Sequence, residues 1–461
     1  MILAGSNASI SFVTRRETSA YHENCCGADC RFDALMRRQL ELHALFQAAP
    51  ARARILVVRR DWAATVGMGN RMRNDAMALV LAMHLDRALL FAECAYEGHA
   101  AKRGLPNCST PHLDYSNVMG LPAEIATATF GPREAAALAA AGQVERYAGA
   151  EGCDRLHPAL GTRVASRGAR DRKSALVLCH RRRLLSLLKM NTTWLTISHY
   201  QNNVPSLSER IIRSDRAAAC IKKCARFVTL QPRGAALALL RETTGLAVRI
   251  DSATRIGAIH VRTGTADSSN SACASISTEQ GLAAVDACFR SRRIAGRTIS
   301  GRIGNIRHCR TQPLFAALPL SRMAAAIKKT CDAALFVSDH AVVSGLLNAA
   351  QVTPEHMSLA ALIPGALKGS DSVTGHSSRL TTRSTFARLT LRAAVEFYLL
   401  SMAHVFVQTT ASAFTHLAHE RGQFYGQDFV QLHVRGGAKQ LCRALGADVL
   451  GRTECEQCAD A

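Results

Sequence analysis

Aromatic residues are scarce in this sequence and make up 5% of its 461 residues. Because proteins that bind single-stranded nucleic acid stack bases on aromatic side chains, this scarcity counts against that class. Long apolar runs are also missing: the longest candidate, residues 77–83, is followed by His84 and Asp86, short of the roughly 18 residues that span a membrane. Residues 1–13 lack the basic start of a signal peptide. We therefore expect a soluble fold, or a membrane anchor outside this sequence.

Acidic residues are few beside basic ones, 35 against 57, which gives a net charge of +22. The electrostatic field of such a charge attracts phosphates, which is typical of proteins that bind nucleic acid or an anionic membrane. Only 9 of the basic residues are lysine, however, and the arginines are spread through an alanine-rich background, which we interpret as compositional bias. The densest basic stretch, residues 288–331, is interpreted as a solvated inserted loop, with an anionic partner as the alternative. We expect no nucleic-acid partner.

Cysteine is abundant by contrast. The 16 cysteines are many for a cytosolic enzyme, and their even number permits disulfides. Three glycosylation sequons begin at Asn7, Asn107 and Asn191. Together these features favour a disulfide-bonded glycoprotein of the Golgi or another secretory lumen if a membrane anchor is missing from this sequence, and a cytoplasmic protein otherwise.

Cysteines can also bind metal ions. The cysteines near the two ends of the chain could be zinc ligands, but we interpret them as disulfides or plain thiols. Cys220 and Cys224 lie one helical turn apart and are interpreted as core residues or as paired elsewhere. The cysteines near the ends are Cys25, Cys26, Cys30, Cys455 and Cys458.

A strand, a glycine loop and a helix follow one another in the first half of the chain. Residues 54–59 are predicted as a buried strand from their β-branched apolar run, and residues 76–83 have apolar positions at helical spacing. Residues 88–91 have the pattern of the next strand. This order is a βαβ unit, which predicts a parallel sheet.

The loop between that strand and that helix contains Gly67 and Gly69. A dinucleotide fingerprint would place its third glycine where Met72 stands, so this interpretation is disfavoured. The plainer alternative is that the glycines allow a tight turn into a helix capped by Asn70.

Three further buried strands are predicted in the second half, at residues 255–261, 334–337 and 404–407, with a helix at residues 386–402. A cluster of polar residues follows each strand. Alternate residues of a strand face the same side of the sheet, so we expect the side chains of His260 and Arg262 to point the same way. Ligands of open parallel sheets bind beyond the carboxyl ends of the strands, so these ends are the predicted binding site.

Four short motifs, in order, resemble those of the superfamily of plant-type cell-wall, α1,2-, α1,6- and protein O-fucosyltransferases. Each motif is short, but their order and spacing agree over residues 54–421. The motifs are Gly67-x-Gly69-Asn70-Arg71, His260-x-Arg262, the strand that ends in Ser338-Asp339, and residues 395–414.

This resemblance implies an α/β protein of the GT-B class, with two Rossmann-like domains facing across a cleft. Residues 1–50 would be an N-terminal extension, residues 51–245 the acceptor-side domain, and residues 246–461 the domain that binds the GDP-sugar. The implied reaction moves fucose from GDP-fucose to a glycan or glycoprotein with inversion. It needs no metal and no cofactor, in line with the absence of an Asp-x-Asp from this sequence. The oligomeric state is not indicated.

The resemblance also implies roles for individual residues. Arg262 would bind the β-phosphate of GDP, and Asn70 and Arg71 would approach the sugar and diphosphate. Ser412 and Phe414 would line the nucleotide site. Glu396 or Asp339 would receive guanine or ribose. The complete donor-binding set is Gly69, Asn70, Arg71, His260, Arg262, Asp339, Glu396, Ser412 and Phe414.

One departure bears on catalysis. Many members have a second arginine and then an acid after the first arginine, where this chain has Thr263 and Thr265. Asp267 is the nearest acid and joins Arg262 as a candidate catalytic residue. A catalytically silent relative that binds glycans or nucleotides is therefore the alternative function. Other candidates for the general base are Asp61, Asp75 and Glu93.

Overall fold

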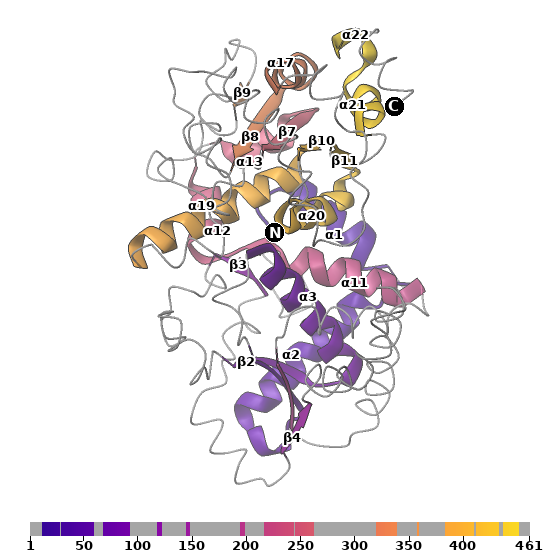
Figure 1. Ribbon diagram of the computed structural model, residues 1–461. Helices are drawn as coiled ribbons and strands as arrows, with labels where there is room; N and C mark the ends of the chain where they lie inside the picture. The colour runs from indigo at the N-terminus through magenta and orange to yellow at the C-terminus, as the bar shows by residue number, and fades with distance from the viewer. Residues whose placement is uncertain are drawn as a thin grey trace, which may run out of the picture. The chain divides into compact units, whose positions relative to one another are not determined.

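The computed structural model describes residues 12–27, 29–59, 68–92, 118–121, 144–147, 194–198, 216–243, 245–261, 320–338, 357–358, 383–409, 412–432 and 437–450 (Figure 1). The chain divides into two units. The first comprises Met1–Phe12, Tyr21–Val66 and Asn70–Gln231, and the second Val13–Ala20, Gly67–Gly69 and Pro232–Ala461. Each unit contains a parallel β-sheet flanked by helices, so the predicted α/β class is confirmed.

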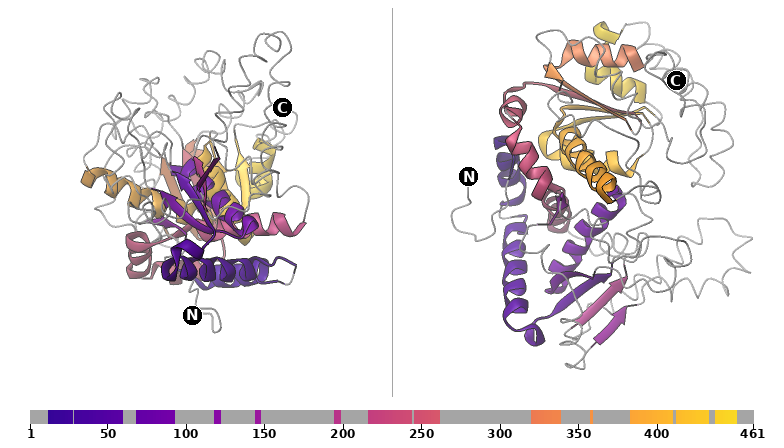
Figure 2. Two further views of the ribbon diagram at one scale, coloured as in Figure 1. Left: turned by 90° about the horizontal axis from the view of Figure 1, so that it is seen from below. Right: turned by 90° about the vertical axis from the view of Figure 1, so that its left-hand side faces the viewer.

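The sheet of the first unit has the strand order β2-β1-β5-β4, with every described pair parallel. Its strands lie side by side in Figure 2, violet to magenta. Helix α3 (Met68–Leu85) connects β1 to β2, which confirms the predicted βαβ unit. On one face of the sheet, Leu42 and Phe46 of α2 (Phe32–Ala48) pack on apolar residues of β1 and β2. The strands are β1 (Ile55–Arg59), β2 (Ala88–Ala92), β4 (Val144–Tyr147) and β5 (Trp194–Ser198).

Helix α3 begins earlier than the sequence predicts. It starts at Met68, so Gly69 and Asn70 lie in its first turn, and the prediction of Asn70 as the cap was wrong. Met72 is 1% exposed and lies one turn before the buried Ala76. The apolar face of the helix therefore extends back by a turn, which favours helix over loop at these residues.

The described residues of the predicted N-terminal extension form α1 (Arg15–Cys25) and α2, and the short η1 (Pro50–Arg52) follows them. The start of α1 is a capping box. Thr14 Oγ1 accepts the N–H of Glu17 at 3.3 Å, and the Glu17 carboxylate accepts the N–H of Thr14 at 2.9 Å. The Thr-x-x-Glu signature was readable in the sequence and shows where the helix begins.

The sheet of the second unit has the order β11-β10-β7-β8-β9, again with parallel pairs. The strands predicted at residues 255–261, 334–337 and 404–407 are confirmed to within a residue at either end. Strands β9 and β11 were not predicted. The bounds are β7 (Ile256–Val261), β8 (Ala333–Ser338), β9 (Met357–Ser358), β10 (Val405–Gln408) and β11 (Asp428–Gln431).

One face of this sheet packs against α17 (Leu320–Thr330), α21 (Gly437–Leu445) and α22 (Ala447–Leu450). Gly257 of β7 lets α17 approach, because a side chain there would collide with Ile327 and Cys331. Helix α19 (Arg383–Met402) also packs on β7 and β8 and precedes β10, which confirms the predicted helix.

The remaining described elements connect or flank these layers. Among the described helices, none combines the length and the apolar character that crossing a bilayer requires. The elements are β3 (Met119–Gly120), which pairs with β6 (Gln231–Pro232), α11 (Arg216–Thr229), α12 (Gly234–Glu242), α13 (Leu246–Ser252), α20 (Ala413–Gly422) and η8 (Gln423–Tyr425).

Within the described part of the first unit, two disulfides connect the end of α1 and the residues after it to α11. Cys25 at the end of α1 bonds to Cys224 of α11, and Cys30 bonds to Cys220 of the same helix, with Cα–Cα distances of 5.8 and 5.5 Å. The expectation of paired cysteines is confirmed for these four. Cys26, by contrast, is an exposed free thiol.

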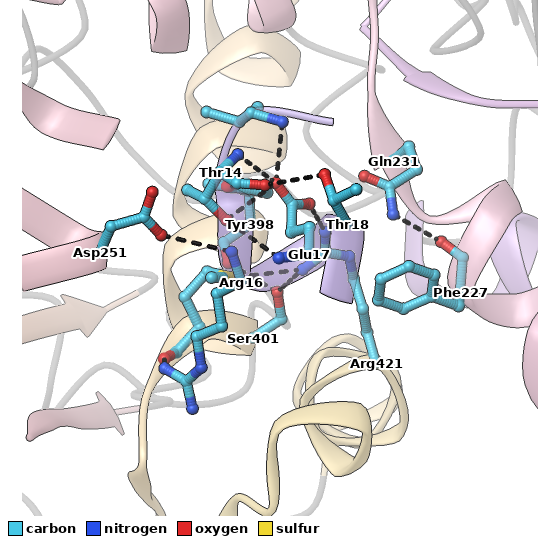
Figure 3. A network of polar contacts seen from close by, with 12 residues as sticks. Thr14, Arg16, Glu17, Thr18, Phe227, Gln231, Asp251, Tyr398, Ser401 and Arg421 are labelled. Carbon is cyan, nitrogen blue, oxygen red and sulfur yellow. Dashed lines mark hydrogen bonds and ion pairs between the residues drawn. The ribbon is translucent and has the colours of Figure 1, made fainter. Parts of the chain in front are cut away.

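A buried carboxylate ties the start of α1 to α19 and α20 within the second unit (Figure 3). Glu17 is 0% exposed, and its Oε2 accepts hydrogen bonds from the Tyr398 hydroxyl and the Thr14 N–H, each at 2.9 Å. Its Oε1 pairs with Arg421, which is equally buried and donates to Ser401 Oγ at 2.6 Å. Both charges are thus buried away from water, and the ion pair and the surrounding hydrogen bonds offset the cost of that burial.

The stability of the second unit is expected to fall as the pH drops from neutral toward 4. His404 Nδ1 accepts the N–H of Ile256 at 2.9 Å, which requires this nitrogen to be unprotonated. Burial, with help from Arg16 and Arg255, lowers the pKa of His404 to about 4. The contribution of neutral His404 to folding stability is complete above the pKa of about 6.5 that histidine has in the unfolded chain. It is lost as the pH falls through the folded pKa, because the unfolded chain binds the proton first.

Thermal unfolding at a series of pH values between 7 and 4.5 checks this, with His404→Asn as the comparison. The asparagine oxygen offers an acceptor that does not titrate, so its melting temperature should decline less steeply with falling pH than that of the wild type. Equal declines in the two proteins would contradict the assignment.

Candidate functional site

The carboxyl ends of β7, β8 and β10 form one edge of the second sheet. His260 of β7 stands in register with Gln408 of β10 and with Val337 of β8. Polar side chains gather at this edge although they are buried: His260 is 6% exposed and Gln408 is 0% exposed. Because ligands of parallel sheets bind at this edge, it is the candidate site.

An aromatic wall stands beside His260. The imidazole lies 5.9 Å from the Phe414 ring, centroid to centroid, and the Phe414 ring lies 5.4 Å from that of Phe397 in a T-shaped arrangement. Phe414 belongs to the first turn of α20 and is only partly buried. Phe397 and His260 are buried, so the partly exposed Phe414 ring is the part of this wall that can contact the face of a planar ring next to the end of β7.

Side-chain hydrogen bonds hold the turn between β10 and α20. The N–H and the hydroxyl of Thr409 both donate to the carbonyl of His260 at 3.2 Å. Gln408 Nε2 donates to Thr415 Oγ1 at 2.6 Å, and this hydroxyl donates to the carbonyl of Ser412 at 2.9 Å. These contacts fix the first turn of α20 against the ends of β7 and β10.

Ser412 is the N-cap of α20, with extended backbone angles and no capping hydrogen bond from its side chain. The N–H groups of the first turn of a helix lack partners within the helix, and the helix dipole places positive charge there. The start of α20 thus has the electrostatic character of an anion site, and it lies beside the aromatic wall.

Glu396 of α19 is held within its own helix. Arg392 Nε donates to Glu396 Oε1 at 2.7 Å, and both side chains are close to 10% exposed, at 11% and 12%. Burial raises the pKa of Glu396, while Arg392 opposes this rise. The next residue, Phe397, belongs to the aromatic wall, so Glu396 lies on the helix that borders the candidate site.

Of the residues that the sequence singled out, the structure brings His260, Ser412 and Phe414 together at this edge, with Glu396 on the neighbouring helix. Gly69 is buried in the first turn of α3, and Asn70 and Arg71 follow it in the same helix. Asp75 is buried on α3. Arg262, Asp267, Asp339, Asp61 and Glu93 lie outside the described residues.

Sequence reasoning missed two residues of this site. Phe397 packs against Phe414, and Thr415 anchors the turn through Gln408. Both lie in apolar helical patterns where a structural role is the default, and only the three-dimensional contacts show that they shape the edge. Gln408 and Thr409 were visible as the polar end of a strand, but not as the pair that fixes the turn.

Comparisons with known proteins leave the family open. No protein-family model matches the chain, and no curated protein matches it. Among solved structures, a FUT1 mutant of Arabidopsis thaliana in complex with GDP is 11% identical, with a TM-score of 0.38, over 93% of this chain and 81% of that one. NodZ α-1,6-fucosyltransferase soaked with GDP-fucose is 13% identical, with a TM-score of 0.34, over 80% and 92%. NodZ from Bradyrhizobium is 14% identical, with a TM-score of 0.33, over the same shares.

Proposed function

We propose that this protein is a glycosyltransferase of the GT-B class that transfers fucose from GDP-fucose to a glycan or glycoprotein acceptor. One observation carries the proposal: His260 of one sequence motif and Ser412 and Phe414 of another converge at the carboxyl edge of the second sheet. The motif resemblance supplies the donor, and the geometry of this edge supports binding of a ring and a diphosphate next to each other.

The described residues have distinct roles in this proposal. The Phe414 ring, backed by the buried Phe397 and His260, packs against the nucleoside, and the N–H groups in the first turn of α20 after Ser412 receive the diphosphate. Glu396 is proposed to bind guanine or ribose, an interaction that requires it to share or release Arg392.

The chemistry is proposed to rest on residues that follow the strands. Arg262 comes directly after Val261, the last residue of β7, and its forked guanidinium is suited to two phosphate oxygens. When the sugar carbon is attacked, negative charge builds on the departing GDP, and Arg262 together with the start of α20 stabilises it. Asp267 is the proposed general base, which takes the proton of the acceptor hydroxyl so that attack from the opposite face inverts the sugar carbon.

A catalytically silent relative is the second candidate, favoured by Thr263 and Thr265 where many fucosyltransferases have arginine and an acid. Binding and turnover separate the two. GDP and GDP-fucose should raise the melting temperature, since a ligand of the folded state stabilises by mass action, whereas UDP and ATP at the same concentration should not. An enzyme will also release GDP from GDP-fucose, and a silent binder will not. No shift with either guanine nucleotide would refute the enzyme and the nucleotide-binding form of the silent relative.

A matched pair of variants at Ser412 ties the binding to α20. Aspartate and asparagine are both good N-caps, so Ser412→Asp and Ser412→Asn should both keep the helix. The aspartate places a negative charge where the diphosphate is proposed to bind, and it should abolish the GDP-dependent rise in melting temperature that Ser412→Asn largely retains. Equal shifts in the two variants would place GDP elsewhere.

Activity is expected to survive EDTA. In the proposed site the charge of the leaving diphosphate is met by Arg262 and by backbone N–H groups rather than by a cation. GDP release from GDP-fucose should therefore proceed at the same rate after chelation and dialysis. Activity that disappears with EDTA and returns with manganese would contradict the GT-B mechanism.

The compartment is proposed to be the Golgi or another secretory lumen. The disulfides Cys25–Cys224 and Cys30–Cys220 support this, because such bonds persist in oxidising compartments and are rare in the cytosol. Mass mapping of secreted material without reduction should recover both bonds. Finding only free thiols there would contradict the compartment.

A further inference from the structure

The sulfurs of the two disulfides form a single cluster in the first unit. Cys25 and Cys30 come from the end of α1 and the residues after it, and Cys220 and Cys224 lie one turn apart on α11. Across the two bonds, Cys224 Sγ lies 3.8 Å from Cys30 Sγ and 3.9 Å from Cys220 Sγ. Three of the four cysteines are buried, with Cys220 partly so. The cluster is therefore sheltered as well as tight.

The two distances from Cys224 Sγ match the edge of a tetrahedral metal site, and the sulfurs of Cys30, Cys220 and Cys224 all lie within 4.8 Å of one another. Zinc binds cysteine sulfur at about 2.3 Å, and the edge of a tetrahedron with bonds of that length is about 3.8 Å. When the disulfides are reduced, Cys30 and Cys220 need only separate to the spacing that each already has from Cys224. Cys25, released from its bond to Cys224, can supply the fourth sulfur. We propose that the reduced chain binds one zinc ion through Cys25, Cys30, Cys220 and Cys224.

The ligand type and the surrounding charge favour zinc. Four thiolates select soft divalent ions, and the two sulfur spacings from Cys224, each equal to one tetrahedral edge, suit a single ion. The resulting site carries two negative charges. Lys223 lies on α11 between the two helical cysteines, and its Nζ donates to the Asn24 side chain at 3.2 Å, next to Cys25. Its positive charge offsets part of the charge of the tetrathiolate.

The metal and the disulfides exclude each other. Two molecules of oxidised glutathione convert the zinc tetrathiolate into the two disulfides, taking four electrons and, with four protons, leaving as four molecules of glutathione while the zinc ion is released. Either state links residues 25–30 to residues 220–224. The first unit thus has a cross-link in an oxidising compartment and another in a reducing one.

The test uses the full chain, reduced without oxygen, given one equivalent of zinc and separated from unbound ion. Elemental analysis should find one zinc per chain, and cobalt in its place should give the visible absorption of four-sulfur coordination. Cys26→Ser, which changes the neighbouring free thiol, is the matched control and should bind one zinc as well. Oxidised glutathione should release the zinc and leave the two disulfides in a peptide map.

Two variants of Cys220 separate metal binding from disulfide formation. Histidine is a zinc ligand but forms no disulfide, so Cys220→His should keep one zinc and lack the bond to Cys30. Cys220→Ser should lose the zinc. The proposal fails if the reduced wild type holds no zinc, if Cys220→Ser holds it as well as the wild type does, or if the zinc stays bound when both disulfides have formed. Should Cys220→Ser fail to fold, loss of zinc from folded Cys220→His would overturn the proposal.

Discussion

Replacing Arg421 with methionine is expected to destabilise the second unit by about 3–5 kcal/mol, because it leaves the Glu17 carboxylate buried without its counter-ion. Both side chains are 0% exposed. The guanidinium also donates to Ser401 and lies 4.9 Å from the centre of the Tyr398 ring, so those groups lose a partner too. Methionine fills a similar volume, which confines the loss to charge and hydrogen bonds.

Urea unfolding followed by circular dichroism measures this loss of unfolding free energy, and two further variants serve as controls. Arg38→Ala removes one side of an exposed ion pair with Asp86 and should cost about 1 kcal/mol or less. The double variant Glu17→Gln with Arg421→Met removes both charges and should be more stable than Arg421→Met alone. An Arg421→Met protein no less stable than Arg38→Ala would show that the buried pair does not hold α1 to α19 and α20.

Arg262→Lys is expected to lower turnover of GDP-fucose by on the order of 10²-fold, although the positive charge is kept. A guanidinium grips two phosphate oxygens in one plane, whereas an ammonium is a strongly hydrated point charge that cannot reproduce the fork. Because the interaction strengthens as charge develops on the leaving diphosphate, kcat should fall, and GDP binding should weaken as well. Folding should not change, since the residue follows the buried strand β7 rather than belonging to it.

Steady-state kinetics of GDP release, with calorimetry of GDP binding, measures both effects. Arg249→Lys is the matched control: this arginine is exposed on α13 in the same unit and should tolerate the change with wild-type kinetics. Wild-type turnover and GDP affinity in Arg262→Lys would reduce the His260-x-Arg262 motif to an ordinary strand end.

Strands buried on both faces were the part of the fold that the sequence predicted best. All six residues of β7 are buried, and such strands appear as continuous apolar runs with a sharp polar end. Strand β11, with the sequence Asp-Phe-Val-Gln, has no such run and was missed. Its position at the edge of the sheet leaves its first residue exposed, so hydrophobic patterning gives it little signal.

Long-range partners were beyond prediction. Glu17 and Arg421 are 404 residues apart, and the paired cysteines are separated by 199 and 190 residues. Local patterns indicate that a side chain is buried or that a cysteine can pair, but not with which residue. The candidate site was predictable in part, because strand ends of a parallel sheet meet at one edge whatever the loops between them do.

Transfer of isotope-labelled fucose from GDP-fucose, measured by mass spectrometry of a glycan pool and of released free fucose, tests the central claim most directly. We expect stoichiometric GDP with labelled fucose on an acceptor or in water, in the presence of EDTA, at a rate that Ser412→Asp abolishes and Ser412→Asn largely keeps. Intact GDP-fucose after prolonged incubation with folded protein that binds GDP, or turnover that Ser412→Asp leaves unchanged, would contradict a fucosyltransferase site at this edge of the sheet.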